Sequence, residues 1–508
     1  MTPAADQAAQ TTGASVMRGG AWTALGHVVP QLYVVAISIA GARFLGPSEF
    51  GRQSFIAFVS LSVLLVLTSG MGLALMRTVA EALGRERPDE ALGVVGWAWR
   101  LQLAGAALGG GGLLVAAALG ARPPGAWAFA GAFVAFGTLQ TVANAILLGA
   151  QHFRSAALVG AVTGAAMVPL IIGVLAAGGG ITGMFAVEAV VAAANLLWTW
   201  LLARRVLHGT PTGVPELRRG ALRFAGWTTV SALVTLVVWR RSEFLFLAHY
   251  STDGQIGLYS IAFATVTAIS AIPEQLSSVL VSAFATLRGA AAAERISSGF
   301  ARSLRLVVLA SLPITAGAAA VGPELLTVVY GEDFREAGTA LLIMVGVIPF
   351  LAVGSIAAAL MSGYDDARTP LLAGAFAAVI NVALAVVLIP RYDATGAALA
   401  NAGAQLAATV ALYVAARRLS GPVRWEAGSL VRCGVASAGC GLAALGMIAL
   451  VGGPVGVALA IPAGAAAFAA LALGLRVLAA DDAAWLDGHL GHVAGGRAGA
   501  LVRRAAAA

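Results

Sequence analysis

The sequence predicts an all-α integral membrane protein of about fourteen transmembrane helices, and two observations carry this prediction. Of its 508 residues, 59% are hydrophobic and only 11% are charged, whereas soluble domains carry about 25% charged residues. Apolar stretches of roughly 20 residues, the length that crosses a hydrocarbon core of about 30 Å, follow one another along almost the whole chain. A soluble enzyme is therefore excluded.

Polar segments and Gly/Pro breaks divide the apolar sequence into candidate spans. A cytoplasmic segment, 1–18, precedes an N-terminal lobe of six spans over 19–205, and a basic connector over 206–223 leads to a second lobe of six spans over 224–418. Two further spans occupy 429–477, and residues 478–508 form a cytoplasmic tail. The predicted spans are 19–42, 50–76, 92–119, 125–148, 156–178, 181–203, 224–248, 255–287, 303–322, 338–361, 370–389, 394–416, 429–451 and 454–477.

Arginine placement supports this division, because cytoplasmic loops of membrane proteins are enriched in basic residues. All 31 basic residues are arginine. When the arginines near span ends are counted with the adjoining loop, 24 fall on one side of the membrane and five on the other, while Arg240 and Arg241 lie inside a span and are counted separately. Both termini are therefore predicted to be cytoplasmic. The net charge of +8 then faces anionic membrane lipid rather than nucleic acid. The absence of lysine also excludes a P-loop that would hydrolyse ATP.

The two lobes contain an internal repeat. Residues 181–205 align without gaps on 394–418, and both segments begin with a Thr-Gly pair and end with Arg-Arg. The loop at 44–51 occupies the place of 250–257. Because each repeat has an even number of spans, both copies enter the membrane from the same side. A pseudo-two-fold axis along the membrane normal, with a central cleft between the lobes, is therefore predicted.

Short motifs in and beside the loops suggest a family. They are Ala42–Gly51, Ser242–Leu247, Gly257–Ser260, Val329–Phe334 and Leu388–Ala398. In this order and spacing, the sequence resembles the Wzx-type polysaccharide or oligosaccharide flippases of the multidrug/oligolipid/polysaccharide (MOP) exporter superfamily over residues 15–480.

This resemblance implies a transporter rather than an enzyme. Such a carrier moves an isoprenoid-diphosphate-linked oligosaccharide, such as a polysaccharide, O-antigen or teichoic-type repeat unit, from the inner to the outer leaflet of the cell membrane by alternating access. It implies a monomer without a cofactor, driven by a membrane potential or by a coupling ion such as a proton or sodium. The exclusive use of arginine departs from the family, whose cavities often also use lysine.

Three other functions stay open at this stage. A lipid II flippase differs from the first hypothesis in substrate alone. A drug or metabolite exporter of the same superfamily usually has about twelve spans, which is fewer than the predicted number here. A membrane-embedded glycosyltransferase or polymerase usually carries acidic residues in long outer loops, and no loop between the predicted spans is long enough to form a domain.

Charged residues within spans are candidates for function, because each costs about 2.5–3.5 kcal/mol to insert. Arg240, Arg241 and Glu243 interrupt the span at 224–248. An arginine fork suits a diphosphate, so these residues are predicted to bind substrate in the central cavity. One alternative is that both arginine side chains extend to the outer membrane–water interface. Another is that Arg240 pairs with Glu243 one helical turn away.

Further polar residues within spans are assigned by their surroundings. Glu188 aligns with Asn401 in the repeat and is predicted, with Asn195, to line the substrate cavity. Pro273 and Glu274 suggest a bent gate or ion site in the span at 255–287, unless a neighbouring hydroxyl neutralises the carboxyl group. His27 is a second candidate for ion coupling, or a buried polar contact. Interhelical contacts are expected of Asn144, Asn381 and Gln405. No metal site is predicted.

The arginine distribution predicts that Gly213, in the connector, faces the cytoplasm. A single cysteine introduced at Gly213 should resist an impermeant thiol reagent added to intact cells and react after permeabilisation. Labelling from outside would show that the number of preceding spans is wrong.

Overall fold

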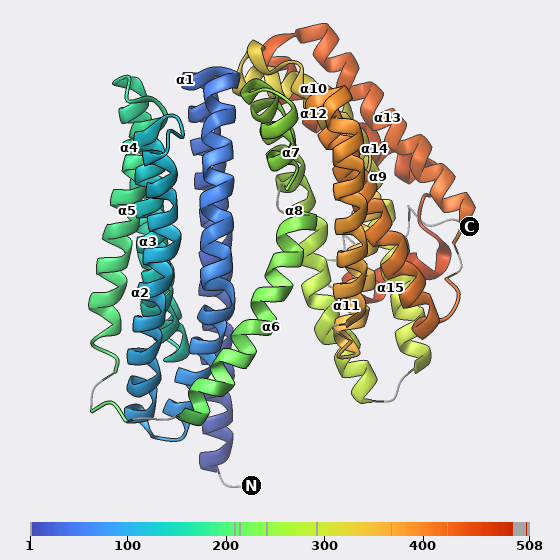
Figure 1. The fold of residues 1–508 in the computed structure, drawn as a ribbon. Helices are drawn as coiled ribbons and strands as arrows, with labels where there is room; N and C mark the ends of the chain where they lie inside the picture. The colour runs from blue at the N-terminus through green and yellow to red at the C-terminus, as the bar shows by residue number, and fades with distance from the viewer. Residues whose placement is uncertain are drawn as a thin grey trace. The chain divides into compact units, whose positions relative to one another are not determined.

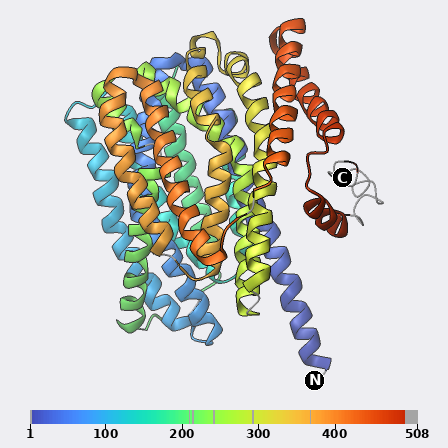
Figure 2. The ribbon, with the colours of Figure 1, turned by 90° about the vertical axis from the view of Figure 1, so that its right-hand side faces the viewer.

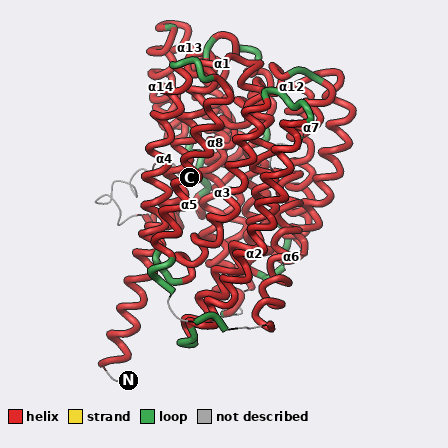
Figure 3. Tube along the Cα trace, turned by 60° about the vertical axis from the view of Figure 1, so that its left-hand side comes forward, coloured by secondary structure: helices red, strands yellow, loops and turns green. Residues whose placement is uncertain are grey.

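The computed structural model describes residues 3–207, 210–212, 215–239, 242–290, 293–366, 368–423, 425–490 and 504. Side chains are described from Tyr33 onward, apart from residues 215, 231, 234–239, 271–279, 282, 293 and 486–490. Within these residues the chain folds into helices and contains no β-strand (Figure 3). The predicted all-α fold is confirmed. Gly213 and Arg424 lie outside the described residues.

The chain forms two compact units, and the first comprises Met1–Leu236. In this unit α3 packs against α2, α5 and α1, while α4 packs against α1 and α5 (Figure 1). Its helices are α1 (Pro3–Gly84), α2 (Pro88–Ala118), α3 (Pro124–Gly149), α4 (Phe153–Ala176), α5 (Gly180–Ala203) and α6 (Pro215–Trp239), the last of which runs to the boundary.

The second unit comprises Val237–Ala508. Within it, α13 and α14 form a hairpin that packs on α9 (Figure 2). The elements are α7 (Glu243–Tyr250), α8 (Asp253–Gly289), α9 (Ala293–Tyr330), the 3₁₀ helix η1 (Glu332–Phe334), α10 (Ala337–Val345), α11 (Ile348–Gly363), α12 (Arg368–Ser420), α13 (Ala427–Val451), α14 (Gly453–Gly474) and α15 (Ala480–Leu490).

Each of the fourteen predicted spans overlaps a described helix. In the described part, nine helices are long and apolar enough to cross a membrane, and the pair α10–α11, bent by 45°, makes ten. Two of the nine, α1 and α12, each contain two predicted spans joined at one non-helical residue, Gly46 (φ 70°) or Asp393 (φ 48°). The two remaining predicted spans fall on α6 with α7 and on α8. The axis that would relate the two lobes stays a prediction.

The predicted seventh span, 224–248, is divided between the two units. The first part, α6, packs on α1: a Cβ atom at Gly70 of α1 would lie 2.1 Å from the carbonyl oxygen of Ala225. The second part, α7, packs on α12 and α8 of the second unit. The boundary at Leu236 therefore falls inside this span, whereas the sequence places it in the connector at 206–223.

Small residues bring the helices of the first unit close together. A Cβ atom at Gly110 of α2 would lie 2.7 Å from the carbonyl oxygen of Gly131 on α3, so only glycine permits this crossing. Large apolar side chains are instead found on the outside, where Leu108 is 78% exposed. Small residues inside and large apolar residues outside are typical of helices packed in lipid.

The repeat segment at 250–257 and the motif Leu388–Ala398 contact each other in the second unit. Ser251, after α7, donates a hydrogen bond of 2.5 Å from its hydroxyl to Oδ1 of Asp393. The side-chain oxygen of Gln255 accepts a hydrogen bond of 3.3 Å from the backbone N–H of Ala394. Asp393 has a left-handed φ of 48°, which costs free energy for a residue other than glycine. These contacts hold this residue at the corner between the two halves of α12.

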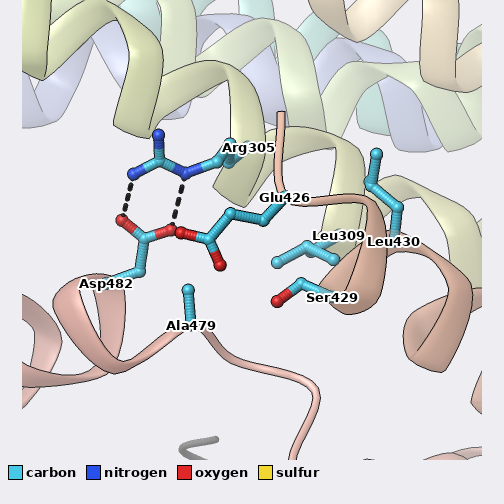
Figure 4. Close-up of a pocket in the computed structure, with 7 residues that line it drawn as sticks. All are labelled: Arg305, Leu309, Glu426, Ser429, Leu430, Ala479 and Asp482. Atoms are coloured by element: carbon cyan, nitrogen blue, oxygen red, sulfur yellow. Dashed lines mark hydrogen bonds and ion pairs between the residues drawn. The ribbon is translucent and has the colours of Figure 1, made fainter. Parts of the chain in front are cut away.

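A buried ion pair fastens the C-terminal helix α15 to α9 (Figure 4). Both carboxylate oxygens of Asp482 accept hydrogen bonds from Arg305, at 2.6 and 2.8 Å. Arg302 donates to the same carboxylate at 3.2 Å, and its guanidinium lies 5.2 Å from the ring centroid of Trp485. The adjoining cavity has a volume of about 10 Å³, room for one water molecule at most. This contact is therefore structural.

Asp482→Asn should detach α15 from α9. The Asp482 side chain is 1% exposed, and removing one partner of a buried ion pair costs about 3–5 kcal/mol. Limited proteolysis should then cleave the tail faster, and the unfolding temperature should fall. Asp481→Asn, at the exposed neighbouring position, is the matched control. Equal proteolysis of both variants would contradict the assigned role of the ion pair.

Candidate functional site

The candidate site lies inside the second unit, where α7 meets α12 and α8. The short helix α7 buries one face, and its residues Glu243, Phe244 and Leu247 are all 0% exposed. Positions i, i+1 and i+4 lie on the same side of a helix, so the carboxylate enters the packed interior with two large apolar side chains. The ring of Phe244 packs edge-on against Tyr259 of α8, with centroids 5.8 Å apart.

Amide groups from both halves of α12 hold the carboxylate of Glu243. Its Oε1 accepts one hydrogen bond of 2.7 Å from Asn381 and another of 2.9 Å from Asn401. Gln405 in turn donates to the side-chain oxygen of Asn401 at 2.9 Å. The fully buried Tyr259 adds a hydroxyl group beside the carboxylate. We call Glu243, Asn381, Asn401 and Gln405 the C-lobe polar cluster.

The C-lobe polar cluster offers more acceptors than donors. Three of its buried oxygens have no hydrogen-bond partner among the described residues: Glu243 Oε2, Asn381 Oδ1 and Gln405 Oε1. None of the described residues forms an ion pair with Glu243. An uncompensated carboxylate within a membrane span is costly, so such groups usually serve ion or proton pathways. Carboxylate and amide oxygens also suit a hard cation. The cluster can therefore bind a proton or a small cation.

The first unit has a neutral polar network instead. Asn195 of α5 accepts a hydrogen bond from Gln140 of α3 at 3.1 Å and donates to the hydroxyl of Thr163 on α4 at 3.2 Å. Thr199 donates to the side-chain oxygen of Asn195 at 3.1 Å. These contacts join three helices, which is the usual role of amides in membrane interiors. Glu188, two helical turns earlier on α5, is half-buried and forms no hydrogen bond with a described residue.

The side chains of the other predicted site residues are outside the described set. Arg240 and Arg241 are not described, and they separate α6 from α7. Pro273 and Glu274 lie within the continuous helix α8, and His27 lies within α1, but their side chains are outside the described set. Among the predicted substrate residues, Glu243 lies with the amides of α12 in the second unit, and Glu188 and Asn195 belong to the first unit.

The sequence alone did not predict that the residues of the C-lobe polar cluster meet. It assigned Asn381 and Gln405 to interhelical contacts, and Asn401 entered only as the repeat partner of Glu188. A signal was present, because Asn401 and Gln405 are four residues apart on one face of an otherwise apolar span. Their common partner on α7 depends on how the spans pack, which periodicity does not determine.

Comparison with known proteins supports the predicted family. Residues 121–339 match the model of a family described as "polysaccharide biosynthesis protein". No curated protein matches the sequence.

Among solved structures, an inward closed conformation of the lipid II flippase MurJ superposes with a TM-score of 0.70 at 14% identity, covering 90% of this chain and 98% of that one. An inward-facing multidrug resistance MATE family transporter of the MOP superfamily gives a TM-score of 0.64 at 14% identity, covering 79% of this chain and 98% of that one. A MOP superfamily transporter from Pyrococcus furiosus gives 0.56 at 16% identity, covering 81% and 96%. The chain thus shares its fold with these transporters, and residues 121–339 resemble the polysaccharide biosynthesis family.

Proposed function

We propose that the protein is a flippase that moves an isoprenoid-diphosphate-linked oligosaccharide from the inner to the outer leaflet of the cell membrane. The observation that carries the proposal is the combination of the polysaccharide family match with the MurJ-like fold over 90% of the chain. The MurJ structure is that of a lipid II flippase, so this fold accommodates a lipid-linked saccharide. The protein acts as a monomer with both termini in the cytoplasm.

The alternatives differ in cargo. A MATE-like drug exporter is supported by the second structural match, but that match covers 79% of this chain, whereas the MurJ match covers 90%. A lipid II flippase shares the same fold and would differ in the saccharide alone. A glycosyltransferase or polymerase is disfavoured because the loops between the described helices are short.

Arg240 and Arg241 stay our candidates for the diphosphate. They lie in the segment that connects α6 of the first unit with α7 of the second. A guanidinium fork can form two parallel hydrogen bonds with a phosphate, whereas lysine keeps the charge but lacks the planar fork.

The C-lobe polar cluster is our candidate for ion coupling. Glu243 begins α7, three residues after Arg240 in sequence, and its carboxylate joins α7 to both halves of α12. Binding of a proton or sodium would offset the cost of the buried charge and weaken the hydrogen bonds that Asn381 and Asn401 donate to it. Release of the ion would strengthen them again. The site therefore offers a way to couple an ion gradient to movement of α7.

Substrate recognition by the arginines is tested by reconstituted flipping. In liposomes, the protein should translocate an isoprenoid-diphosphate-linked oligosaccharide and should not export cationic drugs. Arg240→Gln with Arg241→Gln should reduce the flipping rate at least roughly tenfold, the loss of one charge-assisted hydrogen bond or more, and lysine should restore it in part. Normal flipping by the double Gln variant would show that the arginines do not bind the substrate. Full rescue of its flipping rate by adding Glu243→Gln would show the same.

Ion binding by the C-lobe polar cluster is tested by the unfolding temperature. Sodium at about ten times its Kd should stabilise the wild type by about 1.4 kcal/mol relative to choline at equal ionic strength. If a proton is the ligand, acidification should stabilise it instead, since protonation removes the buried charge. Glu243→Gln should abolish either response.

Asn195→Ala is the matched control, because it breaks the neutral network of the first unit and should lower stability while keeping the ion response. If Glu243→Gln and the wild type respond equally to sodium and to pH, the cluster is not the coupling site.

A further inference from the structure

A pocket of about 330 Å³ lies between α1 and α6 in the first unit, and the mechanism above does not use it. Its size falls within the range of about 300–1,000 Å³ that is usual for ligand sites. It lies on the arginine-rich side of the unit, which the sequence predicts to be cytoplasmic. The charged and aromatic residues that line it are Arg77, Glu81, Glu216, Arg223, Phe224 and Trp227.

The pocket is formed by a close crossing of two helices. Gly70 of α1 allows the backbone of α6 to approach, since a Cβ atom there would lie 2.1 Å from the Ala225 carbonyl oxygen. Ala74 and Ala221, which are 2% and 4% exposed, form a small apolar floor. Their small side chains leave space between the longer residues that follow on both helices.

Arginine and aromatic side chains meet across this space. The guanidinium of Arg77, on α1, lies 5.6 Å from the ring centroid of Phe224, on α6. Arg223 adds a second guanidinium, and neither arginine forms an ion pair with a described residue. Trp227, one turn after Arg223, is 70% exposed. The two cations can accept a phosphate, and the exposed indole offers a flat apolar face beside them.

The carboxylates narrow the class of ligand. Glu216 and Glu81 line the same pocket, and Glu81 also pairs with Arg85 at 2.6 Å. A pocket for a simple anionic lipid headgroup would gain nothing from two acidic side chains, because they repel the phosphate. A saccharide, however, presents hydroxyl donors that carboxylates accept. Cations, carboxylates and an exposed aromatic ring together favour a sugar joined to a phosphate.

We propose that this pocket binds the phosphorylated saccharide headgroup of the cargo before translocation. Arg77 and Arg223 bind the phosphate, Glu216 accepts sugar hydroxyls, and Trp227 stacks on the sugar. The identity of the cargo rests on the proposed function, whereas the binding chemistry rests on the pocket. Arg240 and Arg241 would receive the diphosphate afterwards.

The proposal is tested by ligand binding to the full chain in phosphatidylcholine nanodiscs. The probe is farnesyl diphosphate carrying N-acetylglucosamine, with inorganic pyrophosphate as the sugar-free comparison. Arg77→Gln and Arg223→Gln should each raise the Kd of both ligands roughly tenfold, the effect of one lost charge-assisted hydrogen bond. Arg77→Lys should have a smaller effect. Trp227→Ala should weaken binding of the saccharide probe and leave pyrophosphate unchanged.

Arg204→Gln is the matched control. Arg204 lies 5.1 Å from the ring centroid of Trp200 on α5, so it forms the same kind of cation–aromatic pair in the same unit without lining this pocket. It should bind both ligands with wild-type affinity. Unchanged binding by the Arg77 and Arg223 variants would overturn the proposal.

Two further outcomes separate the sources of phosphate and the two proposals. If phosphatidylglycerol in the nanodisc competes as well as the saccharide probe, or if Trp227→Ala has no effect, the saccharide assignment is overturned and the pocket is a lipid site. If wild-type protein binds the probe through Arg77 but flips no lipid-linked oligosaccharide, the proposed function fails while the pocket stands. Normal flipping by Arg77→Gln and Arg223→Gln variants that have lost probe binding would contradict the role of the pocket in translocation and leave the proposed function intact.

Discussion

A hydrocarbon solvent requires every buried polar group to find its partner inside the protein, and this constraint explains most of the structure. The amide of Asn195 satisfies its neighbours on three helices of the first unit, and the Ser251–Asp393 contact closes the corner of α12. The C-lobe polar cluster differs, because three of its oxygens have no partner among the described residues. An ion that binds there would give these oxygens a partner.

The two units use their related sequences differently. Asn401, which binds Glu243, aligns with Glu188 in the repeat, so an amide in one unit corresponds to a carboxylate in the other. In the first unit this carboxylate has no hydrogen-bonding neighbour among the described residues, and the polar contacts are made by Asn195 two turns further along. Aligned positions of the two repeats thus have different polar surroundings.

Most of the fold follows from hydrophobicity, because roughly 20 apolar residues have to cross the bilayer wherever they occur. Each predicted span overlaps a described helix for this reason, and the non-helical residues Gly46 and Asp393 lie between the predicted pairs of spans. The division of the seventh span was not predictable in this way. It depends on the approach of Ala225 to Gly70 and of Glu243 to Asn381, which are contacts between distant segments. The pocket beside Arg77 and Phe224 was not predicted either, because it also depends on a contact between distant segments. Arg223, Phe224 and Trp227 nevertheless lie within five residues of the sequence.

The central claim is that ion binding at Glu243 drives the movement of a lipid-linked saccharide. The most direct measurement is the flipping rate in proteoliposomes with a sodium gradient, a proton gradient or neither, at a clamped membrane potential. We expect one of the two gradients to accelerate wild-type flipping and to leave Glu243→Gln at the rate observed without a gradient. Equal acceleration of wild type and Glu243→Gln by the same gradient would contradict the account.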